Sequence, residues 1–202
     1  MACSLDFERE LHRQGINRVV GIDEAGRGPL AGPVLVAGVI LPTDFSIKGL
    51  DDSKKLIHAK RELLYEQLTS AADVVWSCIR IEATEIDRLN ILGATHHGMR
   101  EVAFRTAAVH ALIDGLPVPD FPIPHTALVG GDGRSLSIAA ASVIAKVERD
   151  RMMDEAAERY PEYAFERHKG YPTALHLERL KKHGPCPIHR RSFGPVAQLT
   201  LF

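Results

Sequence analysis

Short apolar runs in the first part of the chain predict the strands of a sheet. Residues 19–23 and 33–41 form two such runs, and the second shows so little polar alternation that we expect both of its faces to be buried. The stretch GRGPLAGP between them is rich in turn-forming residues and predicts a hairpin or another tight connection. β-Branched and aromatic residues over 74–81 predict a third strand. Two shorter strands are expected over 112–115 and 126–129.

Longer segments carry apolar residues at the spacing of a helix, about 3.6 residues per turn. This spacing predicts a helix over 58–72 and either one long helix or two over 84–111. In the second of these segments, Thr84 followed by Asp87 resembles the N-terminal capping box of a helix. Two further helices are expected over 138–160 and Ala174–His183.

Strands come first, helices follow, and strands return, which is typical of α/β layers in which helices cover a central sheet. We therefore predict an α/β fold. A length of 202 residues suits one domain with at most a small appendage. We expect one main domain over 1–160 and a basic, helical extension over 161–202 that packs on it.

Composition narrows the class of protein. Hydrophobic residues make up 45% of the chain and charged residues 25%, which is average for a soluble globular protein. No apolar run approaches the roughly 20 residues of a membrane span, and the charged N-terminal stretch lacks the apolar core of a signal peptide. Cys3, Cys78 and Cys186 are far apart and form no disulfide or zinc-binding pattern. We expect a cytoplasmic monomer with no membrane partner.

The net charge of −1 hides an uneven distribution of charge. Residues 167–191 contain seven Lys and Arg residues and four histidines, but only one acid, Glu178. Such a basic patch is typical of a protein that binds a polyanion, although a solvated basic tail has the same composition. We expect most of these histidines to lie at the surface or beside phosphate groups.

Three aspartates stand at the ends of predicted strands, each with a glycine nearby. They are Asp23 in VVGID, Asp114 in ALIDG and Asp132 in ALVGGD. Carboxylates at strand ends can converge at one edge of a sheet, where they repel one another unless a divalent cation neutralises them. Clustered carboxylate oxygens suit hard ions such as Mg²⁺ and Mn²⁺. Taken singly, each aspartate is better explained as a cap on the following turn, although less so for Asp23 because Glu24 follows it.

Glu24 directly follows Asp23, and this raises a question of geometry. Adjacent residues of a strand point to opposite faces, so both carboxylates reach one site only if the strand ends or bulges at Glu24. The following Gly26-Arg27-Gly28 favours such a departure from the strand. Its glycines also let the backbone approach a ligand, so that amide groups and the arginine can bind phosphate or sugar oxygens. An ordinary turn is the alternative.

The chain contains seven motifs in this order: GIDEAGRGPLAGPV, LDDSKKL, EIDRLNILGAT, IDG, GDGRSLSIAAASVIAKVERDRMM, FERHKGYPTALH and HRRSFGPV. Together they resemble bacterial ribonuclease HII, the type 2 ribonuclease H family, over about residues 19–196. The resemblance implies a ribonuclease H-like fold, with a central mixed β-sheet flanked by helices and a C-terminal helical extension. The main domain over 1–160 would then be the catalytic domain.

The resemblance also implies an activity. Members of the family cut the RNA strand of RNA–DNA hybrids and cut 5′ of single ribonucleotides in duplex DNA, which leaves 5′-phosphate and 3′-hydroxyl ends. The implied role is ribonucleotide removal in DNA repair and replication, with two Mg²⁺ or Mn²⁺ ions as cofactors.

The family's four catalytic, metal-binding carboxylates correspond to Asp23, Glu24, Asp114 and Asp132. Family members usually have Lys before the last of these, whereas this chain has Gly131. We expect this difference to alter a phosphate contact and to leave the metal site intact.

Substrate contacts are implied by the same motifs. Gly26, Arg27 and Gly28 would read the 2′-hydroxyl and the backbone around the ribonucleotide, and Tyr171 would stack on the sugar at the RNA–DNA junction. Further candidates are Ser53 and Lys54 at phosphate groups, and then Lys146, Arg149, His168 and Lys169. A polar helix stripe or a solvated loop explains each of the last four equally well.

Two other functions compete with this interpretation. The more similar one is a ribonuclease HIII-like enzyme, which cuts hybrids but acts poorly at single ribonucleotides. The less similar one is a non-catalytic module that binds RNA–DNA hybrids, and such a module would have no need for four carboxylates. The C-terminal AQLTLF also resembles a peptide that docks on a replication sliding clamp, through Gln198, Leu201 and Phe202. A tail that packs on its own domain is the alternative.

Overall fold

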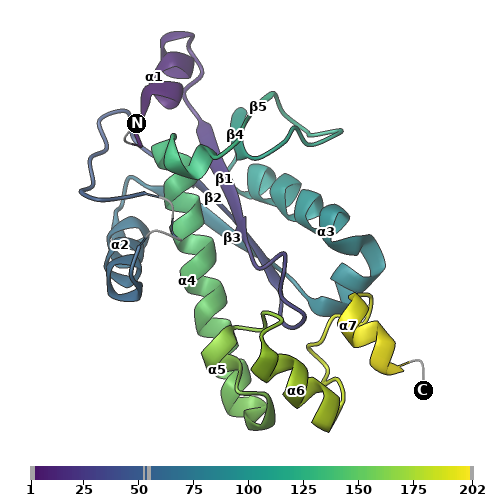
Figure 1. Cartoon of the computed structure of the whole chain (residues 1–202). Helices are drawn as coiled ribbons and strands as arrows, with labels where there is room; N and C mark the ends of the chain where they lie inside the picture. Colours follow the sequence, from purple (N-terminus) through teal and green to yellow (C-terminus); the bar gives the residue numbers. More distant parts are fainter. Residues whose placement is uncertain (1–2, 52, 54–55, 201–202) are drawn as a thin grey trace.

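The computed structural model describes residues 3–51, 53 and 56–200, and its centre is a five-stranded mixed sheet (Figure 1). The strands are β1 (Val19–Ala25), β2 (Val34–Ile40), β3 (Val75–Ile81), β4 (His110–Asp114) and β5 (His125–Leu128). Their order in the sheet is β3-β2-β1-β4-β5. β1 and β2 form the predicted antiparallel hairpin and β3 pairs antiparallel with β2, whereas β4 is parallel to both β1 and β5. The α/β prediction is therefore confirmed.

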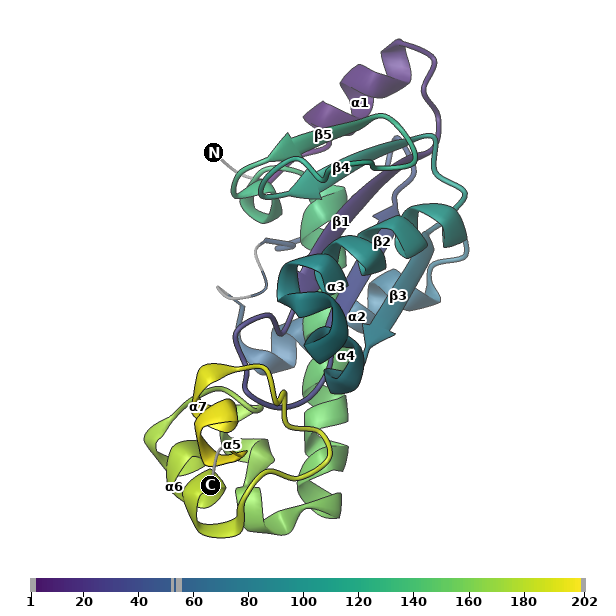
Figure 2. The ribbon, with the colours of Figure 1, turned by 90° about the vertical axis from the view of Figure 1, so that its right-hand side faces the viewer.

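Two long helices enclose the sheet, α4 (Leu136–Arg159) on one face and α3 (Ala83–Arg105) on the other (Figure 2). α2 (His58–Ser70) packs on the same face as α4. All seven residues of β2 are buried, as its apolar sequence predicts. The side chains of β2 alternate between the two faces of the sheet. Leu35 lies in the core beneath α4, and Val36 lies in the core beneath α3.

The sequence left open whether this segment forms one long helix or two, and α3 is a single element with an interruption between two helical parts. Asn90 has φ 56° and ψ 168°, which is not helical. Its Oδ1 accepts hydrogen bonds from the amides of Leu92 and Gly93 at 2.9 and 3.0 Å. Asn90 therefore caps the second of two helices that meet at a kink.

The expected capping box is wrong, because α3 begins at Ala83, ahead of Thr84, and Asp87 has other partners. The Asp87 carboxylate accepts hydrogen bonds from the backbone amides of Arg191 and Ser192, both at 2.9 Å. Asp87 thus ties α3 to the C-terminal segment.

The boundary between α3 and β4 also differs from the expectation. The apolar pattern places the helix end at residue 111 and the strand over 112–115, whereas α3 ends at Arg105 and β4 begins at His110. The chain turns over residues 106–109, where Ala107 has φ 48°. This turn contains neither Gly nor Pro, so the sequence carries no marker of the boundary.

α1 (Asp6–Arg13) is a helix that the apolar pattern does not predict. Its Glu8 is buried and accepts hydrogen bonds at the start of α4, from Ser135 Oγ at 2.6 Å and from the amide of Ser137 at 3.0 Å. The N-terminal segment is thereby fixed against the turn that precedes α4.

The C-terminal segment packs against the end of α4 and the 26–33 connection (Figures 1 and 2). Its helices are α5 (Phe165–His168), α6 (Ala174–His183), which is confirmed as predicted, and α7 (Gly194–Ala197). Short 3-10 turns occupy Gly131–Gly133, Pro161–Tyr163 and Gln198–Thr200. One buried cluster contains Ala31 and Met153 from before residue 160 and Phe165 from after it. The division of the chain into two parts at residue 160 stays a prediction. No helix in the described part of the chain is both long and apolar enough to cross a bilayer.

Candidate active site

Three aspartates from separate parts of the chain converge at one end of the sheet. Ile22 of β1 pairs with Ile113 of the parallel β4, so Asp23 and Asp114 are neighbours on the face that α4 covers. Asp132 arrives from the turn that precedes α4. One carboxylate oxygen from each aspartate lies within 4.8 Å of the other two. The predicted convergence is therefore present in the structure.

Burial makes this group of carboxylates electrostatically unfavourable. Asp23 is only 4% exposed and Asp132 only 7%. The pKa of Asp23 is raised well above its ordinary value, first by burial and then by the charges of Glu24 and Asp114. Hydrogen bonds from Ser142 and from the Glu24 amide, the latter at 2.7 Å, act in the opposite direction. A hard divalent cation would relieve the repulsion, and this oxygen-only donor set fits such an ion.

Glu24 does not leave the strand, and the expected end or bulge there is wrong. β1 continues to Ala25, and Glu24 pairs with Val36 in the regular antiparallel ladder. The pleat therefore places the Cα–Cβ bonds of Asp23 and Glu24 on opposite faces. The Glu24 carboxylate lies 3.3 Å from the Arg27 guanidinium. Pairing with β2 is the physical reason that the strand stays regular.

Two of the three aspartates, Asp23 and Asp114, border a pocket of about 220 Å³ that opens beside the 26–28 turn. We call it the carboxylate pocket. Ten of the predicted site residues line it: Asp23, Glu24, Gly26, Arg27, Gly28, Ser53, Asp114, Lys146, Arg149 and Tyr171. Ala25 and Ser142 complete the described lining. Glu24 and Asp114 also border a second pocket on the α3 side, so the Glu24 side chain is shared between the two spaces.

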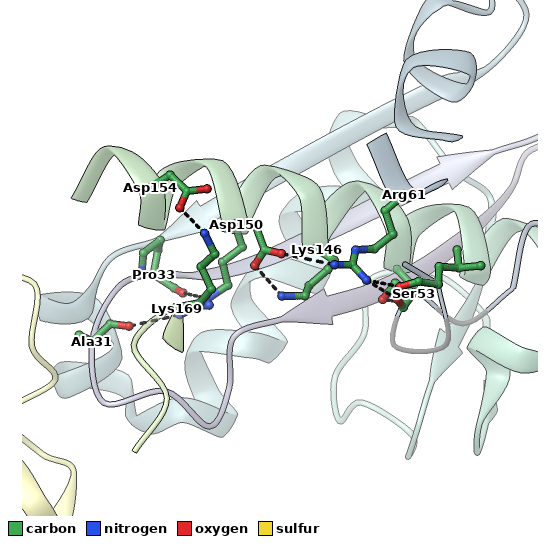
Figure 3. Close-up of polar contacts among 11 residues, drawn as sticks. Ala31, Pro33, Ser53, Arg61, Lys146, Asp150, Asp154 and Lys169 are labelled. Carbon is green, nitrogen blue, oxygen red and sulfur yellow. Dashed lines mark hydrogen bonds and ion pairs between the residues drawn. The ribbon is translucent and has the colours of Figure 1, made fainter. Parts of the chain in front are cut away.

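A row of polar contacts along α4 fixes the basic side chains beside this pocket (Figure 3). Lys146 Nζ donates to Asp150 Oδ1 at 2.5 Å, and the Arg61 guanidinium lies 3.9 Å from the other oxygen of Asp150. Arg61 also donates to the carbonyl of Ser53 at 3.1 Å. The hydroxyl of Ser53 lies 2.8 Å from that of Ser142, which links this row to Asp23.

The remaining predicted residues lie elsewhere. His168 is buried and its ring nitrogens contact the backbone of Tyr163 at 3.0 Å and of Gly170 at 3.2 Å. Lys169 pairs with Asp154 (Figure 3). These positions favour a role in holding the 168–171 loop in place rather than a direct contact with substrate. Lys54 lies outside the described residues.

The expectation of surface histidines is wrong for three of the four. His168, His176 and His189 are buried around Phe165, and His168 stacks on His176 with 4.4 Å between ring centroids. Burial lowers the pKa of both His176 and His189 to about 4. These rings are part of a core, which their place in a basic stretch did not indicate.

Two buried arginines beneath the 26–33 connection have a role that the sequence interpretation missed. Arg190 is fully buried and contacts the carbonyls of Gly26 and Arg27, and Arg149 contacts the carbonyl of Pro33 (Figure 3 shows the contacts of Pro33 and Ala31). The HRRSF motif is the local signal for Arg190, and its charge predicts a surface patch, either bound to a polyanion or solvated, rather than a buried side chain.

Comparisons with known proteins show which family the chain is similar to. The family model described as Ribonuclease HII matches residues 20–196. A Ribonuclease HII of Geobacillus kaustophilus is 50% identical over 195 residues, which is 96% of this chain and 74% of that protein. A Ribonuclease HII of Xanthomonas axonopodis pv. citri is 53% identical over 182 residues, 88% of this chain and 74% of that protein.

Solved structures share the fold. In the structure of the PCNA:RNase HII complex from Archaeoglobus fulgidus, one chain matches with a TM-score of 0.73 and 26% identity, over 88% of this chain and 95% of that one. Bst-RNase HIII in complex with Mn²⁺ matches with a TM-score of 0.70 and 16% identity, over 94% of this chain and 71% of that one. At that identity the second match concerns the fold alone.

Proposed function

The chain belongs to the ribonuclease HII family, and from this premise we propose that it cuts at single ribonucleotides embedded in duplex DNA as well as along RNA–DNA hybrids. It is an endonuclease with an α/β, ribonuclease H-like fold. The observation that carries the proposal is one pocket lined by Asp23, Asp114, the 26–28 turn and Tyr171, with Asp132 clustered beside the first two. The products would carry 5′-phosphate and 3′-hydroxyl ends, which suits a role in ribonucleotide removal during DNA repair and replication.

The carboxylates would hold two Mg²⁺ or Mn²⁺ ions. Asp23 and Asp114 are the first candidates for ligands, with Glu24 as the third and Asp132 beside the second ion. When bound, such ions activate a water molecule and stabilise the leaving 3′-oxygen of a phosphodiester. The Ser142 hydroxyl and the Glu24 amide orient the Asp23 carboxylate through their hydrogen bonds.

Recognition of the ribonucleotide would come from the other side of the pocket. The 2′-hydroxyl is the group that separates RNA from DNA at one position. Gly26, Arg27 and Gly28 line the pocket, and the backbone of the glycines and the side chain of Arg27 are the proposed contacts to such a group. Tyr171 is 44% exposed and adjoins Gly28, so its ring is available to stack on a sugar. Ser53 and Lys146 are proposed phosphate contacts, and Lys54 stays a prediction.

A cleavage assay separates this proposal from its rivals. The substrate is a DNA duplex with one ribonucleotide, offered with and without Mg²⁺ or Mn²⁺. We expect cleavage 5′ of the ribonucleotide that is lost in Asp23→Asn and kept in Asp73→Asn, a matched change at an exposed position. Cleavage of long hybrids alone would favour an HIII-like enzyme. Binding without cleavage in either metal would favour a hybrid-binding module.

We also propose that the C-terminal tail docks on a sliding clamp. The related Archaeoglobus fulgidus protein was solved as a PCNA:RNase HII complex. Gln198 begins the last described turn, and Leu201 and Phe202 lie outside the described residues. Deleting residues 197–202 should abolish binding to the clamp and keep cleavage. Binding that survives the deletion would show that the tail is not the docking segment.

A further inference from the structure

Arg190 connects the end of the chain to the turn that borders the carboxylate pocket. Its side chain is 0% exposed. Its guanidinium donates to the carbonyl of Gly26 at 2.6 Å, of Arg27 at 2.8 Å and of Gly32 at 3.0 Å. One planar group with several fixed N–H directions therefore binds three carbonyls of the same connection.

These contacts determine where two amide groups point. In a trans peptide, the carbonyl of one residue and the N–H of the next point in opposite directions within one plane. The Gly26 carbonyl shares its plane with the Arg27 N–H, and the Arg27 carbonyl shares its plane with the Gly28 N–H. Because both carbonyls face the buried guanidinium, both N–H groups face away from it. Both residues also line the carboxylate pocket, and Arg190 does not.

Neither amide donates a hydrogen bond to another residue of the described part of the chain. The next amides of the connection are used, since Leu30 donates to Gly170 and Gly32 donates to Ile188. Two adjacent, unoccupied donors at the edge of a pocket form a binding position for an oxygen acceptor.

A second buried arginine, Arg149, also restricts the turn. Gly26 has φ 95°, and a Cβ at this position would lie 2.0 Å from Nε of the buried Arg149. Arg149 itself donates to the carbonyls of Pro33 at 3.1 Å and Ala31 at 3.2 Å. The two arginines thus bind successive parts of the connection and leave little freedom for its peptide planes to rotate.

We propose that Arg190 is a positioning residue for ribonucleotide recognition, because it aims the Arg27 and Gly28 amides at the 2′-oxygen of the bound nucleotide. The inference rests on the proposed function and adds a residue that does not itself touch the substrate. The same donors could also bind a phosphate oxygen. An all-DNA duplex has the same phosphates but no 2′-hydroxyl, so a comparison of the two duplexes separates these acceptors.

The test is a binding measurement without divalent metal. The dissociation constants of a one-ribonucleotide duplex and of the same all-DNA duplex are compared for the wild type, Arg190→Lys and Arg191→Lys. Arg190→Lys keeps the charge but cannot bind three carbonyls at once, so we expect the preference for the ribonucleotide to fall about tenfold, as for the loss of one or two hydrogen bonds. Arg191→Lys is the same change at the exposed neighbour and should keep the preference.

Amide hydrogen exchange in the wild type provides a second readout that does not depend on a variant. The Arg27 and Gly28 amides should exchange quickly in the free protein, and the ribonucleotide duplex should protect them more than the all-DNA duplex does. Equal protection by both duplexes would overturn the inference, even if Arg190→Lys failed to fold.

The failure of the inference is distinguishable from the failure of the proposed function. A folded Arg190→Lys that keeps the wild-type preference, in a protein that cleaves at ribonucleotides, would overturn the inference alone. A wild type that neither cleaves at nor prefers the ribonucleotide would overturn both.

Discussion

His176 and His189 meet through their Nε2 atoms at 3.1 Å, inside a core where both rings are buried. The Cys186 amide donates to Nδ1 of His189 at 3.0 Å, so the proton of His189 is on Nε2. His176 then accepts with Nε2 and donates from Nδ1 to the carbonyl of Tyr171 at 2.9 Å. This row of hydrogen bonds requires two neutral rings, since a proton added to either ring places two N–H groups face to face.

Acid should therefore destabilise the protein through this pair. Burial lowers the pKa of both rings to about 4, whereas an unfolded histidine titrates near pH 6.5. Between these values the unfolded chain binds more protons, so the free energy of unfolding should fall as the pH drops from about 6.5 to about 4. Urea unfolding over this range measures the slope.

The double variant His176→Gln/His189→Gln should flatten that slope, whereas His183→Gln, at an exposed position, should keep it. The comparison between variants matters because the raised pKa of Asp23 contributes a slope of the opposite sign. An unchanged slope in the double variant would show that other groups control the acid response.

Asp23→Asn should abolish cleavage but raise stability when no metal is present. The raised pKa of Asp23 means that its ionised form is unfavourable in the folded protein at neutral pH. Asparagine removes the charge and can still accept the Glu24 amide hydrogen bond. We expect the melting temperature in a chelator to rise by about 3 °C, as for roughly 1 kcal/mol in a chain of this size.

The gain should disappear at low pH, where the wild-type Asp23 is protonated. Added Mg²⁺ should stabilise the wild type more than the variant. Asp73→Asn serves as the exposed control and should change neither property. A lower melting temperature for Asp23→Asn at neutral pH would contradict the view that the carboxylates repel one another.

Gly131→Ala should reduce both stability and activity. A Cβ at Gly131 would lie 2.7 Å from Cδ1 of Ile138 and 3.1 Å from Cβ of Leu128, and overpacking of this kind costs about 1–3 kcal/mol. The Gly131 amide also donates to Asp114 Oδ1 at 2.7 Å, so a shift here would move a proposed metal ligand. Urea unfolding and cleavage rates measure the two effects.

Gly194→Ala is the matched control, because a Cβ at that position would meet no atom within 4 Å. The packing also explains why Gly is suited to the position before Asp132 in this chain. If Gly131→Ala kept full stability, the neighbouring side chains would have to repack without cost.

Tyr171→Ala should reduce cleavage at single ribonucleotides more than cleavage of long hybrids. One stacked ring is a larger share of the recognition when only one ribonucleotide is present. Tyr171→Phe retains the ring and should retain most of the activity. Rates on the two substrates measure the difference, and equal losses on both would indicate that Tyr171 only supports its loop.

Local signals predicted the strands and the three converging aspartates. Each aspartate ends an apolar run near a glycine, so the chain around it is enough to place it at a sheet edge. The behaviour of Glu24 was not predictable in this way, because its regular geometry depends on pairing with Val36 in another strand. Arg190 and His176 were expected in a basic surface patch, because the charge pattern of their own segment cannot report a partner far away in sequence.

The hydrogen bonds from Arg190 to Arg27 and Gly26 join positions 163 and 164 residues apart. On the ribosome, the 26–28 turn is synthesised early, yet its support emerges only after nearly the whole chain has been made. A nascent or truncated chain that ends before residue 190 therefore contains all four carboxylates without the group that holds the adjoining turn. In a growing chain, the proposed cleavage residues are thus present long before the residue that secures the proposed recognition turn.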